Sequence, residues 1–81
     1  NKLLRLQVNL GVEKRQSIAG LGENYGAEDL KGRMVAVVTN LVPRKILGMD
    51  SEVMLLAAFD NSGELALLNP DKEMKPGIKV G

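Results

Sequence analysis

The chain has 81 residues, enough for one small domain but too few to bury a large core. It contains no cysteine and no histidine, which excludes disulfides, thiolate metal sites and the commonest general base. Its 11 basic and 10 acidic residues give a net charge of +1, which by itself predicts no affinity for nucleic acid.

No apolar run approaches the roughly 18 residues that a membrane span needs, and no signal-peptide pattern opens the chain. The first residue is Asn1 rather than methionine, so we expect the chain to begin within a longer protein. The lack of cysteine fits a cytosolic origin better than a small secreted scaffold. We therefore expect a cytoplasmic protein that makes no membrane contact.

A hairpin is expected at the start of the chain. Apolar and polar residues alternate from Leu4 to Leu10, and this period of two is typical of a strand with one buried face. Gly11 breaks the pattern, and residues 13–19 form the returning strand, with Ile18 facing inward.

The middle of the chain predicts one helical turn and one buried strand. The turn covers Ala27 to Leu30 and ends at Gly32. Met34 to Thr39 is a continuous apolar run, as a central buried strand requires. A long connection follows from Asn40 to Ser51, and three of its apolar residues are expected to attach it to the core: Leu41, Ile46 and Leu47.

A second hairpin is expected near the end. Glu52 to Phe59 forms a strand, Asp60 to Gly63 a turn, and Glu64 to Leu68 the partner strand. Pro70 stops this strand, and a short segment from residue 78 to residue 80 follows another turn. About five short strands with one helical turn predict an all-β fold, and a five-stranded oligonucleotide-binding (OB) barrel is the natural candidate at this length.

Enzyme chemistry is poorly supported. None of the serines at positions 17, 51 and 62 lies in a nucleophile-elbow motif. The Gly20-Leu21-Gly22 segment lacks the remaining parts of a phosphate-binding loop, and no calcium-loop spacing surrounds Asp60. We predict no catalytic residue, no metal and no cofactor.

The charges are distributed unevenly along the chain. From Ile46 through Asp71 there are acids but no basic residue, whereas between Leu30 and Ile46 the reverse holds, with Lys31, Arg33, Arg44 and Lys45. Such asymmetry can create a basic face on a nearly neutral protein. The alternative is a set of scattered, solvated charges.

The composition restricts how such a face could bind RNA. Tyr25 and Phe59 are the only aromatic residues, so the chain cannot stack successive bases on several rings. Contacts should therefore go to phosphate, to sugar and to the shape of a folded RNA.

Two basic residues are the best candidates for these contacts. Arg44 and Lys45 sit together beside a proline on a predicted exposed loop, where binding groups usually lie. Asn40 can bond a base edge or a 2′-hydroxyl, or it can cap the end of a strand. Lys14 and Arg15 lie at the tip of the first hairpin, where they contact RNA or only aid solubility.

A family resemblance is carried by the segment from Asn40 to Met54, which reads Asn-Leu-Val-Pro-Arg-Lys-Ile-Leu-Gly-Met-Asp-Ser-Glu-Val-Met. It resembles the Asn-Leu-x-Pro-x-Lys, apolar, x-Gly, Ser-x-small-Met pattern of the tRNA-binding domains that end bacterial methionyl-tRNA synthetases. Residues 2–11 and 67–77 are similar to the opening strand and closing segment of that family. The resemblance therefore covers essentially the whole chain.

The resemblance implies a non-catalytic OB barrel that grips the tRNA elbow with little sequence preference. It also implies a homodimer and attachment to the catalytic domain of a methionine–tRNA ligase. Stand-alone tRNA-binding proteins and the endothelial-monocyte-activating polypeptide share the family. By position, the family's RNA-contacting motif falls on Asn40, Lys45, Ser51 and Met54, with Arg44 beside them.

The sequence departs from the family pattern in three places. Val53 stands where the family usually has glycine or alanine, and we expect its branched side chain to narrow the groove near Ser51. Asn1 replaces the family's aspartate. The family's first strand would precede this residue, so it is either absent from the protein or part of a preceding segment. We expect another chain or segment to cover the strand edges that it would otherwise pair with.

Two other functions remain open. Leu47, Met49 and Met54 can form an interface for dimerisation or protein docking, although Met54 can also be a core residue. A chaperone-like relative of the same barrel would instead bind peptides.

Overall fold

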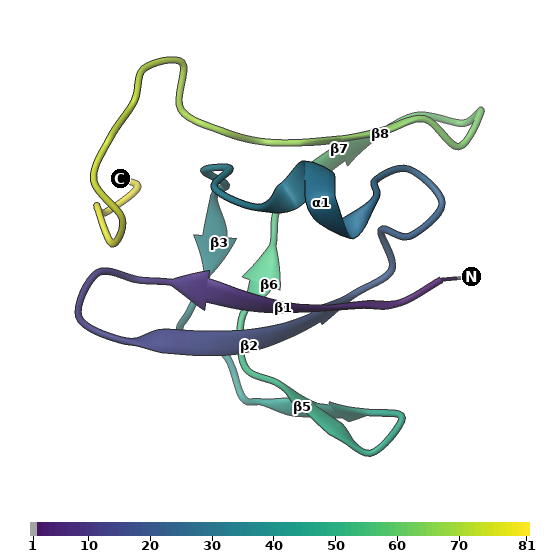
Figure 1. Cartoon of the computed structure of the whole chain (residues 1–81), viewed down its shortest axis with the longest axis horizontal. Helices are drawn as coiled ribbons and strands as arrows, with labels where there is room; N and C mark the ends of the chain where they lie inside the picture. The colour runs from purple at the N-terminus through teal and green to yellow at the C-terminus, as the bar shows by residue number, and fades with distance from the viewer. Residues whose placement is uncertain (1) are drawn as a thin grey trace.

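The computed structural model describes residues 2–81, and Asn1 lies outside them. The first hairpin pairs β1 (Leu4–Asn9) with β2 (Lys14–Ala19) in antiparallel register, from Leu4 opposite Ala19 to Asn9 opposite Lys14. Side chains of β1 alternate between half-buried and exposed, because alternate residues of a strand face opposite sides. The predicted first hairpin is confirmed (Figure 1).

The predicted helical turn is also confirmed, as α1 (Ala27–Leu30). The Gly26 amide donates to Oδ2 of Asp29 at 3.1 Å, and the Asp29 amide donates to the Gly26 carbonyl at 3.0 Å. These bonds satisfy amides that the first turn of a helix leaves free. Gly32 follows with φ of +77°, a conformation that ends the turn.

The middle strands are shorter than the sequence predicts. Only β3 (Val37–Val38) forms within the run expected to be a central buried strand, and it is half-buried against β6 (Met54–Leu55). The expected strand over residues 52–59 is divided into β6 and β7 (Ala57–Phe59), because the chain changes partner at Leu56. The Leu56 amide still donates to the Ala36 carbonyl at 2.9 Å, next to β3, whereas its carbonyl accepts from the Leu68 amide at 3.0 Å.

A second predicted hairpin is confirmed by β7 and β8 (Leu65–Leu67), which pair from Ala57 opposite Leu67 to Phe59 opposite Leu65. The Asp60 amide donates to the Glu64 carbonyl at 3.0 Å and closes the predicted turn.

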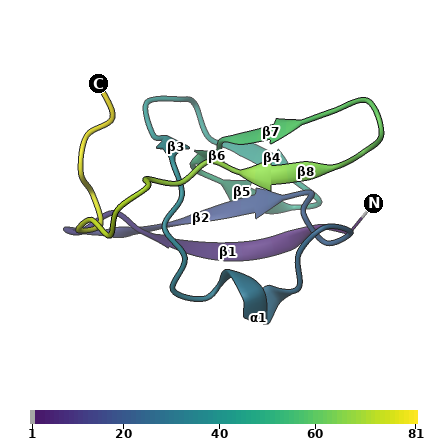
Figure 2. The same ribbon diagram turned by 90° about the horizontal axis from the view of Figure 1, so that it is seen from above.

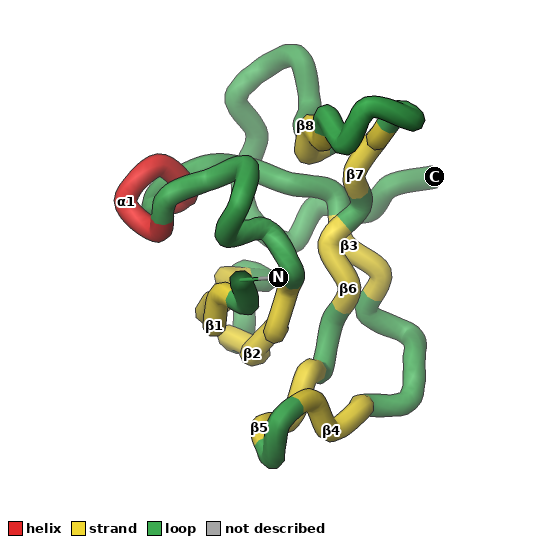
Figure 3. The backbone as a smooth tube through the Cα atoms, turned by 90° about the vertical axis from the view of Figure 1, so that its right-hand side faces the viewer, coloured by secondary structure: helices red, strands yellow, loops and turns green. Residues whose placement is uncertain are grey.

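The expected long connection instead contains a hairpin of its own. β4 (Arg44–Ile46) pairs with β5 (Met49–Ser51), and Leu47 and Gly48 form the two-residue turn. Figures 1 and 3 place this β4–β5 hairpin and the β7–β8 hairpin at opposite ends of the molecule. The expectation that Leu47 attaches this segment to the core is wrong, since its side chain is 81% exposed.

The strands form four separate two-stranded ladders, β1–β2, β3–β6, β4–β5 and β7–β8. The fold is therefore mostly β with one tiny helix, as predicted, but residues 2–81 do not close into a single five-stranded barrel. Figure 2 shows the ladders stacked beside one another, with α1 outside β1. The buried apolar residues of the described chain come from three segments that are distant in sequence: Ile18 and Leu21, then Val53, then Leu67.

The molecule exposes an unusually large surface for its size. Its accessible area is 6250 Å², whereas a folded monomer of 8.7 kDa is expected to expose about 4,700 Å². An open groove of about 1340 Å³ lies along β1 and is lined by apolar residues that include Leu6, Val8, Val37 and Met74. No helix within residues 2–81 is long and apolar enough to cross a membrane.

Candidate nucleic-acid interface

Arg44 and Lys45 occupy successive positions of β4, opposite Ser51 and Asp50 of β5. Both basic side chains are exposed. Because successive residues of a strand face opposite sides, the two side chains leave opposite faces of the β4–β5 hairpin. The structure therefore brings the two cations onto one thin ribbon but does not place them side by side.

Only Lys45 has an acidic partner. Its Nζ lies 3.2 Å from Oδ1 of Asp50, and both side chains are well exposed. An exposed pair of this kind contributes little to stability, so a phosphate can replace the carboxylate at small cost. Among residues 2–81, no carboxylate lies within ion-pairing distance of Arg44.

Ser51 is not on the exposed face. The residue is 9% exposed, and the Ile18 amide donates to its Oγ at 3.0 Å. The hydroxyl of Ser17 donates to the Val53 carbonyl at 2.9 Å, beside it. Ser51 therefore joins β5 to β2 in the interior, whereas the family resemblance implies that it contacts RNA.

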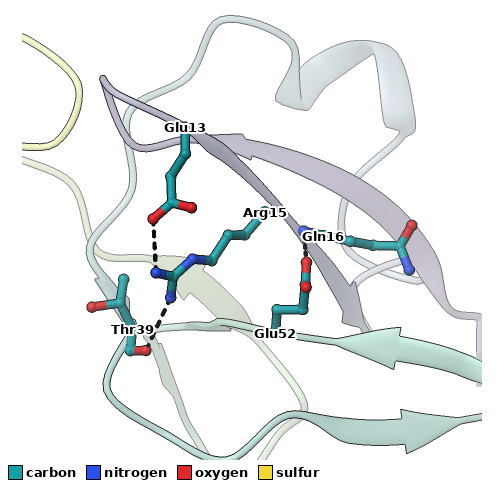
Figure 4. A network of polar contacts seen from close by, with 5 residues as sticks. All are labelled: Glu13, Arg15, Gln16, Thr39 and Glu52. Atoms are coloured by element: carbon teal, nitrogen blue, oxygen red, sulfur yellow. Dashed lines mark hydrogen bonds and ion pairs between the residues drawn. The ribbon is translucent and has the colours of Figure 1, made fainter.

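A second set of bonds joins the same two segments. The Gln16 amide donates to Oε1 of Glu52 at 2.9 Å (Figure 4). The Glu52 amide in turn donates to the Gln16 carbonyl at 2.8 Å. The Gln16 side-chain amide also donates to the Asp50 carbonyl at 2.8 Å. We call the bonded residues Gln16, Ser17, Ile18 and 50–53 the β2 clamp. It fixes the base of the β4–β5 hairpin to β2.

Arg15 makes contacts within the protein. Its Nη2 donates to Oε2 of Glu13 at 2.7 Å, and its Nη1 donates to the Thr39 carbonyl at 3.3 Å (Figure 4). The hydrogen bond and the charge of Glu13 raise the pKa of Arg15 above its usual value. Arg15 thus supports the chain just before Asn40, while neighbouring Lys14 is exposed.

The remaining predicted contact residues lie at the surface. Asn40 is exposed between β3 and β4, and Met54 is 51% exposed on β6, opposite Val38. Val53 is only 2% exposed, so its branched side chain fills the core and does not narrow an exposed groove beside Ser51. The exposed set on and beside the β4–β5 hairpin is Asn40, Arg44, Lys45 and Met54.

Neither aromatic ring lies on this hairpin. The hydroxyl of Tyr25 accepts a hydrogen bond from the Leu67 amide at 3.0 Å, and the Arg33 guanidinium lies 5.4 Å from the ring centre. Phe59 is 79% exposed, but it stands on β7 next to Asp60. Within residues 2–81, no group of three acidic, histidine or cysteine side chains can hold a metal ion.

The sequence did not predict that Leu47 occupies the turn of a hairpin. It lies at the tip of the hairpin with φ of +52°, and it is the one non-glycine residue with positive φ among residues 2–81. The available signal was the glycine that follows it, because Gly48 within an apolar stretch permits a two-residue turn.

Comparison with known sequences agrees with the family resemblance described above. The family described as “Putative tRNA binding domain” matches residues 1–79. The methionine–tRNA ligase of Thermotoga maritima is 52% identical over 80 residues, and that of Methanocaldococcus jannaschii is 51% identical over 79 residues. Each match covers 98% of this chain, which spans only 12% of the length of these relatives.

Two solved structures have similar folds. The chaperone CsaA of Bacillus anthracis superposes with a TM-score of 0.91 at 32% identity, over 98% of this chain and 76% of that one. The MetRS related protein of Pyrococcus horikoshii superposes with a TM-score of 0.90 at 32% identity, over 99% of this chain and 73% of that one.

Proposed function

The chain belongs to the tRNA-binding domain family, and from this premise we propose that it is the non-catalytic tRNA-binding module of a methionine–tRNA ligase. The observation that carries the proposal is the family match over residues 1–79, which includes the whole exposed β4–β5 hairpin. We assign the ligase reaction to a separate catalytic domain, because this chain spans only 12% of the length of the ligases that it matches.

The module grips the outside of the tRNA elbow through phosphate and sugar contacts. Arg44 and Lys45 leave opposite faces of a two-stranded ribbon, so each can meet a phosphate on its own side. Such contacts carry no sequence information, which fits binding by shape. Asn40 and Met54 lie beside the residues that contact phosphate. Lys14, just before the β2 clamp in the sequence, adds a further exposed positive charge.

Ser51 and Arg15 support the interface from within. Ser51 holds the β4–β5 hairpin on β2, and Arg15 holds the chain at Thr39, directly before Asn40. We therefore assign both residues a positioning role in tRNA binding.

The module assists the ligase by raising the local concentration of tRNA. A weakly bound, tethered tRNA meets the catalytic domain at an effective concentration on the order of millimolar. Modest affinity of the module is therefore sufficient for this role.

The proposal is tested by reversing the two charges of the hairpin. Arg44→Glu combined with Lys45→Glu should abolish binding of bulk tRNA in a gel shift, because two phosphate contacts become repulsions. Wild-type binding should also weaken steeply with added salt, and neutralising both residues with glutamine should reduce the slope of log K against log salt by about 1.5.

The matched control is Lys72→Glu combined with Lys75→Glu, which changes the net charge equally in the C-terminal segment. Binding of this control should fall only slightly. A titration in which the Arg44/Lys45 variant and the wild type coincide, with both folded by circular dichroism, contradicts the proposal.

We also propose that the short strands of residues 2–81 are parts of an incomplete OB barrel, and that a further strand completes it by pairing with β1. Within residues 2–81, β1 pairs with β2 alone, which leaves its other edge available for a further strand. The apolar groove beside β1 and the large exposed area support a covering strand there.

A homodimer working in the cytoplasm is the assembly we propose. A standard interface removes about 800 Å² from each partner, which is less than the excess area that the chain exposes. Cytoplasmic tRNA is the substrate pool that such a module would serve.

Peptide binding is the second candidate function. The similarity to the chaperone CsaA and the apolar groove along β1 favour it. An extended apolar peptide would bind there with little dependence on salt, whereas tRNA binding depends on salt steeply. Competition between such a peptide and tRNA at two salt concentrations separates the two functions.

A further inference from the structure

Leu47, at the tip of the β4–β5 hairpin, has a backbone conformation that is unfavourable for leucine. Leu47 has φ of +52° and Gly48 has φ of +79°, and two-residue turns with positive φ at both positions strongly prefer asparagine or glycine first. For leucine, this conformation brings Cβ too close to the following carbonyl oxygen. The fold therefore tolerates backbone strain at this residue.

Packing within the domain does not explain the strain. The Leu47 side chain is 81% exposed, and a Cβ placed on neighbouring Gly48 would meet no atom within 4 Å. The turn thus projects into solvent. Backbone strain that the fold itself does not need is characteristic of functional sites.

Charge distinguishes this exposed residue from a similar one at the other end of the molecule. Leu47 is carried by the strands that hold Arg44 and Lys45. Phe59 is almost equally exposed at 79%, but its hairpin carries Asp60 and Glu64 and no basic residue. A polyanion is attracted to the first hairpin and repelled by the second.

We propose that Leu47 is an RNA-contacting residue that packs on the ribose and base surface between the phosphates bound by Arg44 and Lys45. The inference rests on the proposed function and adds an apolar contact to it. The two basic side chains leave opposite faces of the ribbon, three and two residues before Leu47, so phosphates bound to them would lie on either side of the strand that leads to the tip. The wide, shallow minor groove of a folded RNA displays sugars and base edges that such a tip can reach.

The decisive variant is Leu47→Asn. Asparagine accepts the left-handed conformation, so thermal unfolding should shift upward by about 4 °C. Loss of the apolar contact should weaken binding of bulk tRNA about tenfold. The salt dependence should stay as in the wild type, because no charge is changed. Stability and affinity then move in opposite directions, which a purely structural role for Leu47 does not produce.

Phe59→Thr is the matched control, since it also removes an exposed apolar side chain and places a strand-forming residue in β7. Its tRNA affinity should equal that of the wild type. Equal affinity of Leu47→Asn and wild type overturns the inference while leaving the proposed function intact. A wild-type chain that fails to bind tRNA overturns the proposed function itself.

A contact between two copies of the chain is the competing explanation. Sedimentation of the wild type and of Leu47→Asn across a concentration series distinguishes a contact with RNA from a contact between copies of the chain. If Leu47→Asn lowers self-association and binds tRNA as tightly as the wild type where both are monomers, Leu47 contacts protein and the RNA contact is rejected.

Discussion

At the scale of single residues, Asp60 illustrates how a turn fixes a carboxylate. Its Oδ1 accepts hydrogen bonds from the Ser62 hydroxyl at 2.7 Å, the Ser62 amide at 2.9 Å and the Glu64 amide at 3.1 Å. The hydroxyl bond, followed by the amide bonds, lowers the pKa of Asp60 below its usual value. These bonds favour the ionised form, so they stabilise the turn only while Asp60 is charged.

The consequence is a stability that depends on pH. The ordinary pKa of an aspartate is about 3.8, and the pKa of Asp60 in the folded state is lower, so the unfolded state binds more protons at pH values between the two. This contribution is present above about pH 4 and is lost as pH falls through the lowered pKa. Asp60→Asn should therefore be less stable than the wild type at pH 7, with the difference shrinking toward pH 2 in denaturant unfolding. Asp71→Asn, in the C-terminal segment, is the control; a pH-independent difference for Asp60→Asn would refute this account.

The contact residues could be predicted from the sequence only in part. Exposure of Asn40, Arg44 and Lys45 follows from their polarity and from the proline beside them. The burial of Ser51 could not be predicted, because it depends on an amide of β2, 33 residues earlier in the chain. Whether these residues contact RNA stays a prediction.

At the scale of secondary-structure elements, the β2 clamp decides where the β4–β5 hairpin points. Ser51→Ala would leave the Ile18 amide without its acceptor in a buried position. A loss of this kind costs about 1–3 kcal/mol, and each 1 kcal/mol lowers the melting temperature of a domain this size by about 4–8 °C. In circular dichroism melts, Ser51→Ala should therefore unfold at a temperature at least about 4 °C below that of the wild type. A variant that melts like the wild type yet loses tRNA affinity would instead make Ser51 a direct contact.

Elements with a local signal were predicted correctly. The β1–β2 and β7–β8 hairpins follow from alternation and from turn residues such as Asp60 and Gly63. The β4–β5 hairpin was missed because leucine occupies the turn position where asparagine would have signalled it. The division of the strand at Leu56 depends on a switch of partner from Ala36 to Leu68, and both partners are distant in sequence.

At the scale of the whole molecule, the exposed area predicts association. If part of the surface of 6250 Å² is covered by a second copy, sedimentation should give a larger average mass as concentration rises. The melting temperature should rise with concentration for the same reason, because the partner binds only the folded chain. A monomer at every concentration, with a constant melting temperature, removes the dimer.

The same exposed area affects how the isolated chain unfolds. The denaturant m-value and the heat-capacity change both scale with the surface that unfolding newly exposes. A folded state that already leaves much apolar surface in water, as along the groove beside β1, has less left to expose. Globular domains have an average heat-capacity change of unfolding of about 12–15 cal/mol/K per residue. The value for this chain should be lower, and its thermal transition should be broad. For this domain, a shallow melting curve is thus the expected result for a folded chain whose groove beside β1 is open to water.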